Sequence, residues 1–587
     1  MKAYISELLD QAIQNISPDE AEAVLGSGVF DVTYPKSGFG DYATNVAMVL
    51  FKKFKTAPAG SPIEFASNLA DSLTKLDKGN SFSKIESVNG FINFTLSQKF
   101  LLNRLSNVLE QAGDYGKLKL GENRTVIVEY FQNNIAKPPH VGHLRSAVIG
   151  DSLVRILQFV GYKTVTDTHI GDWGVQFGIL LRAYKDFIEA GGNKAQIESN
   201  PVIELNKLYV EYSGKIEDSP QLRELGKAEF QKLETGDAEN RELWEWFVKV
   251  SLDDFERYRN LLGILPFDYN LGESFYEKQM AGVLTIFEEK KLTSVGDTGE
   301  IYVDLEPYGL GRCILVKSDG ATTYHLRDFA TYIYRKNEFN FYRNLYIVDV
   351  RQSHHFRQLF KVLELAGFPA ETDSIHLEFG FMSLPEGAIS TRKGNTISLE
   401  NLIAEAEKRA REIIEEKNPS LQNKDAVVKQ VALSAIKYFD LSHNRSTEIV
   451  FNWDQALSFE GNTGPYLQYT HARIHGIFRK ASEDGVDVSI QNIDDSVDLD
   501  QSELTVLRKL QQFPEIIELV ANQYLPNLLT NYLFELAQSF NSFYQESPIL
   551  KEADLQKRSL RLSLIKATSQ VLENGLNLLG ITAPTEM

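Results

Sequence analysis

The hydrophobic and polar positions of residues 126–160 change their period once, from that of a strand to that of a helix. Residues 126–130 (V-I-V-E-Y) are a short, mostly apolar run that predicts a buried strand. A tight loop with two consecutive prolines follows, and a long amphipathic helix begins at about His140. The pattern breaks at Gly161, and residues 163–168 predict a second strand. The order strand, helix, strand predicts a βαβ unit and therefore a parallel sheet.

The rest of the chain divides by the same criterion. Residues 1 to about 118 form a first block, in which 88–96 (V-N-G-F-I-N-F-T-L) predicts a strand. Residues 185–300 are polar, charged and helical in pattern, which predicts an insertion inside the α/β domain. Strand-like segments return at 301–303, 314–316 and 345–350. After about residue 401 the periodicity is helical almost to the end, so we expect domains at 1–118, 119–404 and 405–587, the second with an insertion at about 185–300.

Length and composition limit the class of protein. A chain of 587 residues is too long for one core, which agrees with several domains. We find no run of about 18 apolar residues, and the first amphipathic helix carries Glu7 and Asp10, so we predict no transmembrane helix, no signal peptide and no membrane partner. The one cysteine, Cys313, excludes a disulfide framework and a thiolate zinc site and fits a reducing cytoplasm. The net charge of −19 argues against non-specific coating of nucleic acid, but not against local basic patches.

The candidate chemistry lies where the first strand turns into the helix. His140 and His143 are three residues apart at the helix start, so they share one face. Free backbone N–H groups at such a helix N-terminus suit the phosphates of a nucleotide, and Gly142 removes a side chain where a base or ribose could approach. Histidines placed there stabilise charge that develops on a pyrophosphate leaving group, and Lys137 adds a positive charge.

Two other interpretations of the histidine pair stay open at this point. An H-x-x-H spacing can hold zinc, although neither an H-E-x-x-H pattern nor a third ligand cluster accompanies it. Two histidines at a helix start can also act only as a structural cap, which would be the more common case for the motif alone.

Residues 139–151, P-H-V-G-H-L-R-S-A-V-I-G-D, resemble the HIGH signature of class I aminoacyl-tRNA synthetases in the form carried by the arginyl enzymes. Further segments are similar to that family and occur in its order: 169–178 (H-I-G-D-W-G-V-Q-F-G), 267–276 (F-D-Y-N-L-G-E-S-F-Y), 317–328 (K-S-D-G-A-T-T-Y-H-L-R-D), 458–473 (S-F-E-G-N-T-G-P-Y-L-Q-Y-T-H-A-R) and 571–582 (V-L-E-N-G-L-N-L-L-G-I-T). A four-residue H-x-G-H is weakly specific, whereas this ordered set, which spans about residues 30–587, is strongly specific.

The second class I signature departs from the family's K-M-S-K-S. The best match is 388–396, A-I-S-T-R-K-G-N-T, in which Ala388 and Thr391 replace the two usual lysines. By resemblance, Ser390, Arg392 and Lys393 join Lys137, His140, Gly142 and His143 as the catalytic and ATP-binding residues. Taken alone, the segment could also be a solvated basic turn between a strand and a helix, although this is the less common case.

The choice of amino acid depends on carboxylates, because a guanidinium needs acceptors for two parallel N–H···O bonds. The acidic candidates are Glu129, Glu273 and Asp328. By resemblance, Tyr324 and Asp328 line an arginine pocket, and Asn134 and Gln352 hold the polar groups of the amino acid. A cysteinyl enzyme would need thiolate ligands for zinc, and a leucine, isoleucine or valine enzyme would need a large editing insertion and an apolar pocket, so neither fits.

The resemblance also implies contacts with RNA. We expect Asn89, Phe91 and Asn93 to share one face of the strand at 88–96 and to read unpaired bases by stacking and hydrogen bonds. Tyr466, Tyr544 and Met587 match positions associated with the anticodon. The structural alternatives are a half-buried strand for the first set and core packing for the aromatic residues of the second.

The resemblance therefore implies a multidomain α/β plus all-α protein. It would have an N-terminal α+β domain that binds the outer corner of tRNA, a Rossmann-like parallel-sheet catalytic domain with a helical insertion, and a C-terminal helical-bundle domain that binds the anticodon. The implied activity is arginine–tRNA ligation with L-arginine, ATP with Mg²⁺ and tRNA(Arg). The single cysteine adds the expectation of a cytoplasmic protein without structural zinc, and we expect a monomer because no extended exposed apolar helix is evident. Two rivals remain: a nucleotidyltransferase of the H-x-G-H type that acts without RNA, and a catalytically silent RNA-binding paralogue.

Overall fold

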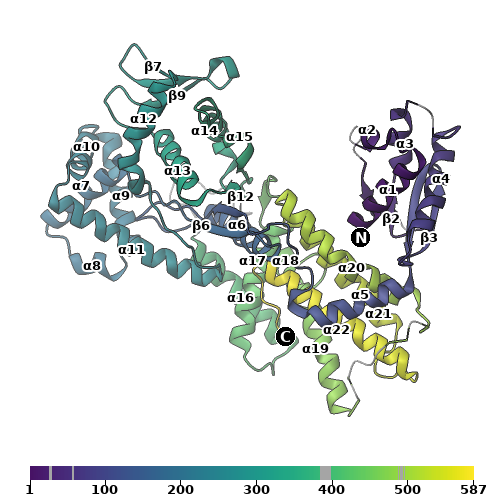
Figure 1. The fold of residues 1–587 in the computed structure, drawn as a ribbon. Helices are drawn as coiled ribbons and strands as arrows, with labels where there is room; N and C mark the ends of the chain where they lie inside the picture. Colours follow the sequence, from purple (N-terminus) through teal and green to yellow (C-terminus); the bar gives the residue numbers. More distant parts are fainter. Residues whose placement is uncertain are drawn as a thin grey trace.

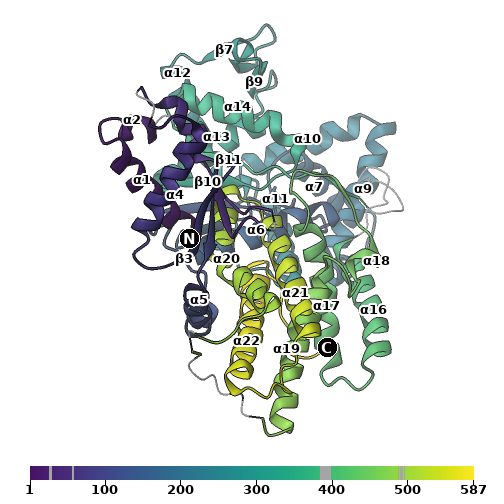
Figure 2. The ribbon, with the colours of Figure 1, turned by 90° about the vertical axis from the view of Figure 1, so that its right-hand side faces the viewer.

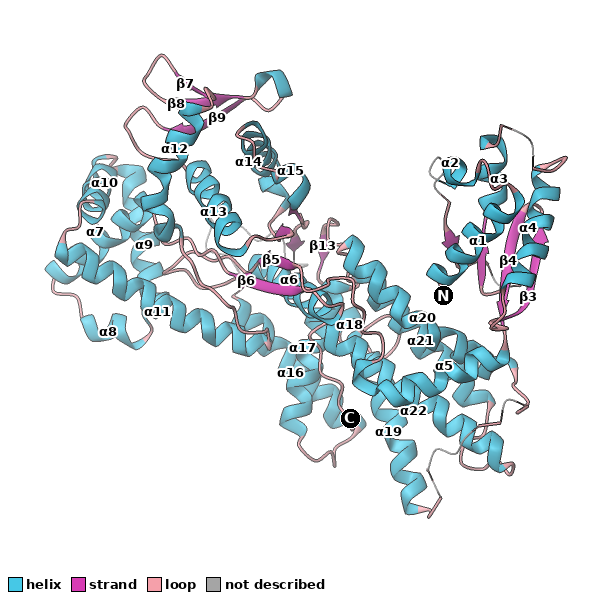
Figure 3. Cartoon of the chain, viewed as in Figure 1, coloured by secondary structure: helices cyan, strands magenta, loops and turns pink. Residues whose placement is uncertain are grey.

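A four-stranded parallel sheet lies at the centre of the protein. The computed structural model describes residues 1–25, 30–36, 38–55, 58–383, 398–486, 488, 493–494 and 496–587. In spatial order the strands of the central sheet are β11 (Ser374–His376), β10 (Arg343–Tyr346), β5 (Thr125–Glu129) and β6 (Lys163–Asp167). Helix α6 (Val141–Phe159) connects β5 to β6, which confirms the βαβ unit (Figure 3).

The strand order reverses between β5 and β10. From β5 the chain first proceeds to β6 on one side and later returns to β10 on the other. In an open parallel sheet, ligands bind at such a point, beyond the carboxyl ends of the strands. Glu129 ends β5, and the loop that leads to α6 lies at this reversal.

The segment between β6 and β10 has two parts. Its first part is helical and corresponds to the expected insertion: α7 (Val175–Glu189), α8 (Lys194–Ser199), α9 (Pro201–Asp218), α10 (Gln221–Glu234) and α11 (Ala238–Leu262). Its second part comprises α12 (Met280–Glu289), a small sheet of β7 (Thr293–Val295), β8 (Ile301–Asp304) and β9 (Arg312–Val316), and α13 (Tyr324–Phe339). The expected strands at 301–303 and 314–316 exist, but they pair antiparallel in this separate sheet and do not join the central one.

The N-terminal region is an α+β unit that stands to one side (Figure 1). It contains α1 (Lys2–Ile16), α2 (Ala21–Leu25), α3 (Val46–Leu50), α4 (Pro62–Leu76) and a sheet in the order β1 (Val32–Thr33), β2 (Tyr42–Thr44), β4 (Phe91–Leu96), β3 (Phe82–Val88). The expectation of one strand over 88–96 was wrong. Asn89 and Gly90, at φ 53° and 86°, form a two-residue turn between β3 and β4, which is the turn that an Asn-Gly pair favours.

Helices make up most of the remaining chain. After α14 (Ser353–Leu365), α15 (Ala370–Asp373) and β12 (Met382–Ser383), the chain forms α16 (Leu399–Lys417), α17 (Lys424–Leu441), β13 (Ile449–Val450), α18 (Trp453–Ala456), α19 (Gly464–Glu483), α20 (Gln501–Gln523), α21 (Asn527–Glu546) and α22 (Leu555–Leu578). The N-terminal α5 (Gln98–Gln111) packs against α20 and α22, as Figure 2 shows. Within the described residues, no helix is long and apolar enough to cross a membrane.

The helical domain is fixed to the centre of the catalytic domain. Arg145 on α6 forms an ion pair with Asp440 on α17, at 3.1 Å between Nε and Oδ2, and both side chains are buried. Nη1 of Arg145 also donates to the carbonyl oxygens of Gly380 and Thr447, at 2.7 and 2.8 Å. This buried ion pair fixes α6 against α17, because removal of either Arg145 or Asp440 would leave an unpaired buried charge.

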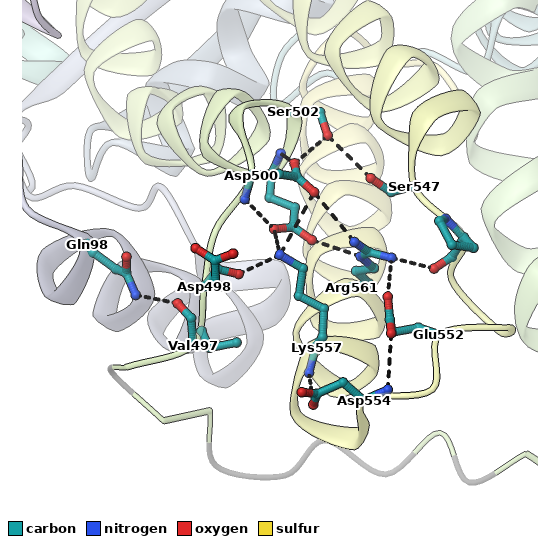
Figure 4. A network of polar contacts seen from close by, with 12 residues as sticks. Gln98, Val497, Asp498, Asp500, Ser502, Ser547, Glu552, Asp554, Lys557 and Arg561 are labelled. Carbon is teal, nitrogen blue, oxygen red and sulfur yellow. Dashed lines mark hydrogen bonds and ion pairs between the residues drawn. The ribbon is translucent and has the colours of Figure 1, made fainter.

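A second cluster of charges lies where α20 and α22 of the helical domain begin (Figure 4). Glu503, at the start of α20, is fully buried and accepts from Arg561 and Lys557 of α22, each at 2.8 Å. Arg561 also pairs with Glu552 at 2.8 Å and donates to the carbonyl of Pro548 at 2.7 Å. These contacts join α20, α22 and the turn between α21 and α22.

Candidate active site and RNA-binding surfaces

The two histidines of the H-x-G-H motif cap α6 reciprocally. Nδ1 of His140 accepts the backbone N–H of Gly142 at 3.0 Å, and Nδ1 of His143 accepts the backbone N–H of His140 at 3.1 Å. The imidazole rings lie 4.0 Å apart between centroids. Because Nδ1 is the acceptor in both rings, a neutral imidazole must carry its proton on Nε2.

Both histidines are held neutral. Burial, together with the positive charges of Lys137 and Arg351, lowers the pKa of His140 to about 4. Burial, with His140 and Lys137 as neighbours, also holds the pKa of His143 well below its ordinary value. Two neutral N–H donors at a helix N-terminus favour an anionic ligand.

Gly142 serves the cap itself. A Cβ at this position would lie 2.7 Å from Cε1 and 2.9 Å from Nδ1 of His140. The space that we expected to admit a base or ribose is therefore used by the imidazole that folds back over the first turn.

A cavity of about 600 Å³ lies beside the loop that enters α6. Asn134, Lys137 and His140 form one wall. The opposite wall comes from α7 and α9 of the insertion and comprises Gln176, Phe177, Leu180, Asn206, Lys207, Tyr209, Val210 and Glu211. Burial lowers the pKa of Lys137. His140, the first residue of the motif, thus faces an open cavity.

The second signature, with Ser390, Arg392 and Lys393, lies outside the described residues. Ser398, the first described residue after this segment, forms an antiparallel bridge with His140, and the backbone N–H of Leu399 donates to the carbonyl of Pro139 at 3.3 Å. The start of α16 therefore lies against the H-x-G-H motif.

Asp328 on α13 is the centre of a second group of side chains. Its Oδ2 lies 2.6 Å from Nε2 of His355 on α14, and its Oδ1 lies 3.5 Å from Nε2 of His169 in the loop after β6. Burial disfavours the carboxylate, but the bonds to His169 and His355 hold the pKa of Asp328 well below its ordinary value. About a quarter of the side chain stays accessible, which suits a carboxylate that receives a cationic ligand.

The other predicted arginine-binding residues differ in their exposure and in their contacts. Tyr324 is half exposed one turn before Asp328, and its ring stacks on His325 and lies 4.9 Å from His355. Glu273 is paired with Arg327 at 2.8 Å, so Arg327 does not pair with the neighbouring Asp328. Gln352 is exposed at the N-cap of α14, and its role in binding arginine stays a prediction.

Glu129 ends β5 as expected, but its carboxylate already has a cationic partner. Arg335 on α13, which is 1% exposed, lies 2.6 Å from Oε2 of Glu129 and 2.8 Å from Oδ2 of Asp167. The side chain of Glu129 is 5% exposed. The structure thus places Glu129 within a buried triad at the ends of β5 and β6.

Backbone hydrogen bonds join the loop before the H-x-G-H motif to the loop that contains His169. Gly171, two residues after His169, donates to the carbonyl of Asn133 and accepts from the N–H of Ile135, both at 3.0 Å. Asn134 packs so closely on Gly171 that a Cβ there would lie 2.0 Å from Oδ1 of Asn134. The loop before the H-x-G-H motif is therefore held against the loop that contacts Asp328.

Sequence reasoning missed His169, His355 and Arg335. No sequence motif marks Arg335 or His355, because their partners, Glu129, Asp167 and Asp328, lie far away in the chain. His169 lies in the quoted segment H-I-G-D, and its backbone adopts φ 43°, a left-handed conformation that few residues other than glycine take.

The N-terminal set differs from its prediction. Asn89 is exposed in the turn, and Phe91 is 48% exposed at the first position of β4. Asn93, two residues on, is buried, opposite Ala43 and Glu86 in the register of the sheet. The expectation that all three share one open face was wrong, because the hairpin turn takes Asn89 out of the strand and Asn93 is only 4% exposed.

A cavity of about 670 Å³ in the helical domain brings together part of the second set. Tyr466 and Met587 both line it, with Tyr469, Arg473, Asn541 and Gln545. Tyr544 is 39% exposed and stacks on Phe540. Side chains of the helical domain hold four backbone carbonyls near the C-terminus. Lys437 donates to Gly580, Gln468 to Thr582, His471 to Pro584 and Asn418 to Met587.

Among the described residues, no cluster of three or more histidine, cysteine or carboxylate side chains could hold a metal ion. Nδ1 of each histidine of the H-x-x-H pair is occupied by a backbone N–H. The pair is therefore built to donate from Nε2, and a zinc site at this place would need ligands that the described part of the chain does not bring there.

A parallel sheet with an H-x-G-H helix at its reversal point, followed by a helical domain, defines a class I aminoacyl-tRNA synthetase. The family model "tRNA synthetases class I (R), catalytic domain" matches residues 104–453, "DALR anticodon binding domain" matches 467–587, and "Arginyl tRNA synthetase N terminal domain" matches 3–96. The chain belongs to the arginyl-tRNA synthetase family, the arginine–tRNA ligases of class I.

Relatives and solved structures agree over the full length. A curated arginine–tRNA ligase of Clostridioides difficile is 41% identical over 587 residues, which is 100% of this chain and 99% of that protein. One of Lactococcus lactis is 40% identical over 100% of both. The arginyl-tRNA synthetase of Thermus thermophilus has a TM-score of 0.81 at 26% identity and covers 100% of both chains. That of Plasmodium falciparum has a TM-score of 0.80 at 25% identity, over 100% of this chain and 99% of that one.

Proposed function

We propose a division of labour among the residues of this chain in the reaction of its family. In the first step, the carboxylate of L-arginine attacks the α-phosphorus of ATP, and pyrophosphate leaves. The Nε2–H groups of His140 and His143 and the ammonium of Lys137 donate to phosphate oxygens where negative charge develops. The reaction needs no covalent nucleophile on the enzyme, because positioning and electrostatics provide the rate.

We place the guanidinium of arginine at Asp328 and Glu273. These two carboxylates are about a quarter accessible, whereas Glu129 is enclosed with Arg335. Tyr324 packs against the guanidinium, and Asn134 and Gln352 hold the amino and carboxylate groups. Glu129 then acts on arginine through Arg335 and His169 and not by direct contact.

The second step transfers arginine to the 3′-terminal adenosine of tRNA(Arg), on the 2′-hydroxyl as class I geometry implies. We propose that Asn89 and Phe91 on the N-terminal hairpin contact the outer corner of the tRNA and that the cavity of Tyr466 and Met587 receives an anticodon base, with Tyr544 beside it. We propose ATP-phosphate binding also for Ser390, Arg392 and Lys393. The nucleotide substrate is ATP with Mg²⁺, bound tRNA promotes activation, and the enzyme works as a cytoplasmic monomer. The division into domains at 1–118, 119–404 and 405–587 goes with this proposal.

One observation carries the proposal: the loop at 169–171 contacts Asp328 and is bonded to the loop that leads into the H-x-G-H motif. A carboxylate for a cation and donors for phosphates are thereby held in one rigid arrangement. The test is arginine-dependent ATP–pyrophosphate exchange with and without tRNA. We expect exchange with arginine that is strongest with tRNA present. Exchange driven by a carboxylate other than an amino acid would favour a nucleotidyltransferase that acts without RNA, and no exchange with any amino acid would favour a silent paralogue.

A further inference from the structure

The arginine pocket that we propose around Asp328 already contains cations before arginine enters. Arg327 pairs with Glu273, and Arg335 pairs with Glu129 and Asp167. Guanidinium groups keep their charge under all conditions in which the protein is folded. The imidazole of His169 differs from them, because it can lose its proton. Of these three cationic groups, only His169 can therefore give up its charge when a cationic substrate enters.

The two histidines that contact Asp328 do so differently. Nε2 of His355 lies 2.6 Å from Oδ2, which is a hydrogen bond that a neutral ring also makes. Nε2 of His169 lies 3.5 Å from Oδ1, too far for a strong hydrogen bond, so this contact depends on charge. Oδ1 is therefore the oxygen that is open to a stronger donor.

We propose that His169 is a positioning residue whose proton holds Asp328 in the empty pocket, and that the guanidinium of arginine takes over Oδ1 and expels that proton. The inference rests on the proposed function, since it names arginine as the ligand of Asp328. The balance is simple: arginine enters as a cation, one proton leaves His169 for solvent, and the net charge of the pocket is unchanged. Arginine binding is thereby linked to pH.

The surroundings of His169 support this exchange. The titratable and charged groups that face it are Glu129 at the end of β5, Asp172 in its own loop, Glu273 and Tyr276 after that loop, and Asp328 and Arg335 on α13. Burial opposes protonation, but Glu129 and Asp328 raise the pKa of His169 to about 9. The ring is therefore protonated at neutral pH in the empty pocket. Its buried Nδ1 has no hydrogen-bond partner within the described structure, so Asp328 is the group that fixes its direction.

The test is calorimetric titration of arginine into the full-length protein in two buffers of different ionisation enthalpy. At pH 8 we expect about one proton released per arginine, and an affinity that rises by up to about tenfold per pH unit between pH 7 and 8.5. His169→Asn should release no proton and bind arginine with an affinity that does not depend on pH. Asparagine is chosen because it accepts the left-handed backbone conformation of this position. His475→Asn, on α19 of the helical domain, is the matched control and should keep the release of the proton.

Each possible result either supports or overturns the proposed proton release from His169. A wild-type protein that binds arginine without releasing a proton, or a His169→Asn variant that still releases one, overturns the inference. Should His169→Asn lose arginine altogether, the wild-type pH profile is decisive: a flat profile overturns the inference and a rising one supports it. The variant His355→Asn, which keeps the imidazole of His169, should still release the proton. Absence of arginine binding by the wild-type protein at every pH would instead overturn the proposed function itself.

Discussion

Nδ1 of His143 accepts the backbone N–H of His140 at 3.1 Å, so one imidazole both closes the start of α6 and presents its Nε2–H outward. The structural and catalytic roles of His143 thus reside on different nitrogen atoms of one ring. They can be separated by substitution, because a side chain that keeps the acceptor and loses the outer donor removes only one of the two roles.

The first prediction compares His143→Asn with His143→Ala. Asparagine retains an oxygen that can accept the N–H of His140, whereas alanine removes the cap at a cost of about 1 kcal/mol. We expect both variants to lose about 10²–10³-fold in the rate of adenylate formation, because both lack the Nε2–H donor. Only His143→Ala should also melt at a lower temperature. Pyrophosphate exchange and thermal unfolding give the two readouts, and arginine affinity should stay near that of the wild type.

The second prediction concerns Glu129. Glu129 is the partner of buried Arg335, so Glu129→Gln should lower the melting temperature. Arg335→Met should destabilise the protein more, by about 3–5 kcal/mol, because it leaves two buried carboxylates unpaired. If Glu129 were a direct ligand of arginine, Glu129→Gln would instead raise KM for arginine without any loss of stability. Melting curves and steady-state kinetics of the same preparation distinguish the two roles. A raised KM with an unchanged melting temperature contradicts the enclosed position that we describe.

The third prediction is a loss of stability in mild acid. Burial and the neighbouring His355 lower the pKa of His325 to about 4, below the ordinary value of an unfolded chain. The unfolded state then binds the proton first, so the stabilisation is complete above about pH 6.5 and is lost as pH falls towards 4. We expect a steep fall of the melting temperature over this window and a shallower fall for His325→Gln. Part of the remaining slope comes from the other histidines whose pKa burial lowers: His140 and His376, each to about 4, and His143, His471 and His475. An identical slope in the variant would contradict the assignment.

The sequence predicted what depends on local pattern. The βαβ unit, the helical insertion and the helical last third follow from periodicity, and the place of His140 and His143 follows from a strand that turns into a helix. The H-x-G-H motif is contiguous, so its geometry is set by one turn of backbone. Asp328 was found for a different reason, because the resemblance to a family marked its position.

The rest could not be predicted because it arises from contacts between distant segments. Arg335 meets Glu129 only when α13 packs at the end of β5, and His355 reaches Asp328 from another helix. The turn at Asn89 and Gly90 did have a local signal, since Asn-Gly between apolar runs predicts a hairpin. We overlooked it because the apolar residues on both sides made 88–96 resemble one continuous strand.

The fourth prediction separates tRNA contact from folding on β4. Phe91 is 48% exposed and its neighbour Ile92 is fully buried. Phe91→Ala should weaken the use of tRNA, by about 1–3 kcal/mol of stacking if a base lies on the ring, and should leave the melting temperature unchanged. Ile92→Ala is the matched control: it should cost about 2–5 kcal/mol of stability because it opens a cavity in the sheet. Charging kinetics at several tRNA concentrations measure the first effect. Equal loss of the tRNA-independent partial reaction in Phe91→Ala would point to misfolding.

The fifth prediction uses the charge cluster of Figure 4 to test whether the far end of the helical domain contributes stability without contributing chemistry. Arg561→Met leaves buried Glu503 with Lys557 alone and also removes the bonds to Glu552 and Pro548, so it should destabilise the helical domain by about 3–5 kcal/mol. Lys557→Met leaves the Arg561 contacts intact and should cost about 2 kcal/mol. Adding Glu503→Gln to Arg561→Met should restore part of the loss, because the unpaired charge is then gone. Denaturant unfolding ranks the three variants, and pyrophosphate exchange at low temperature should be the same in all of them. If Lys557→Met were the more damaging single change, the arginine would not be the centre of the cluster.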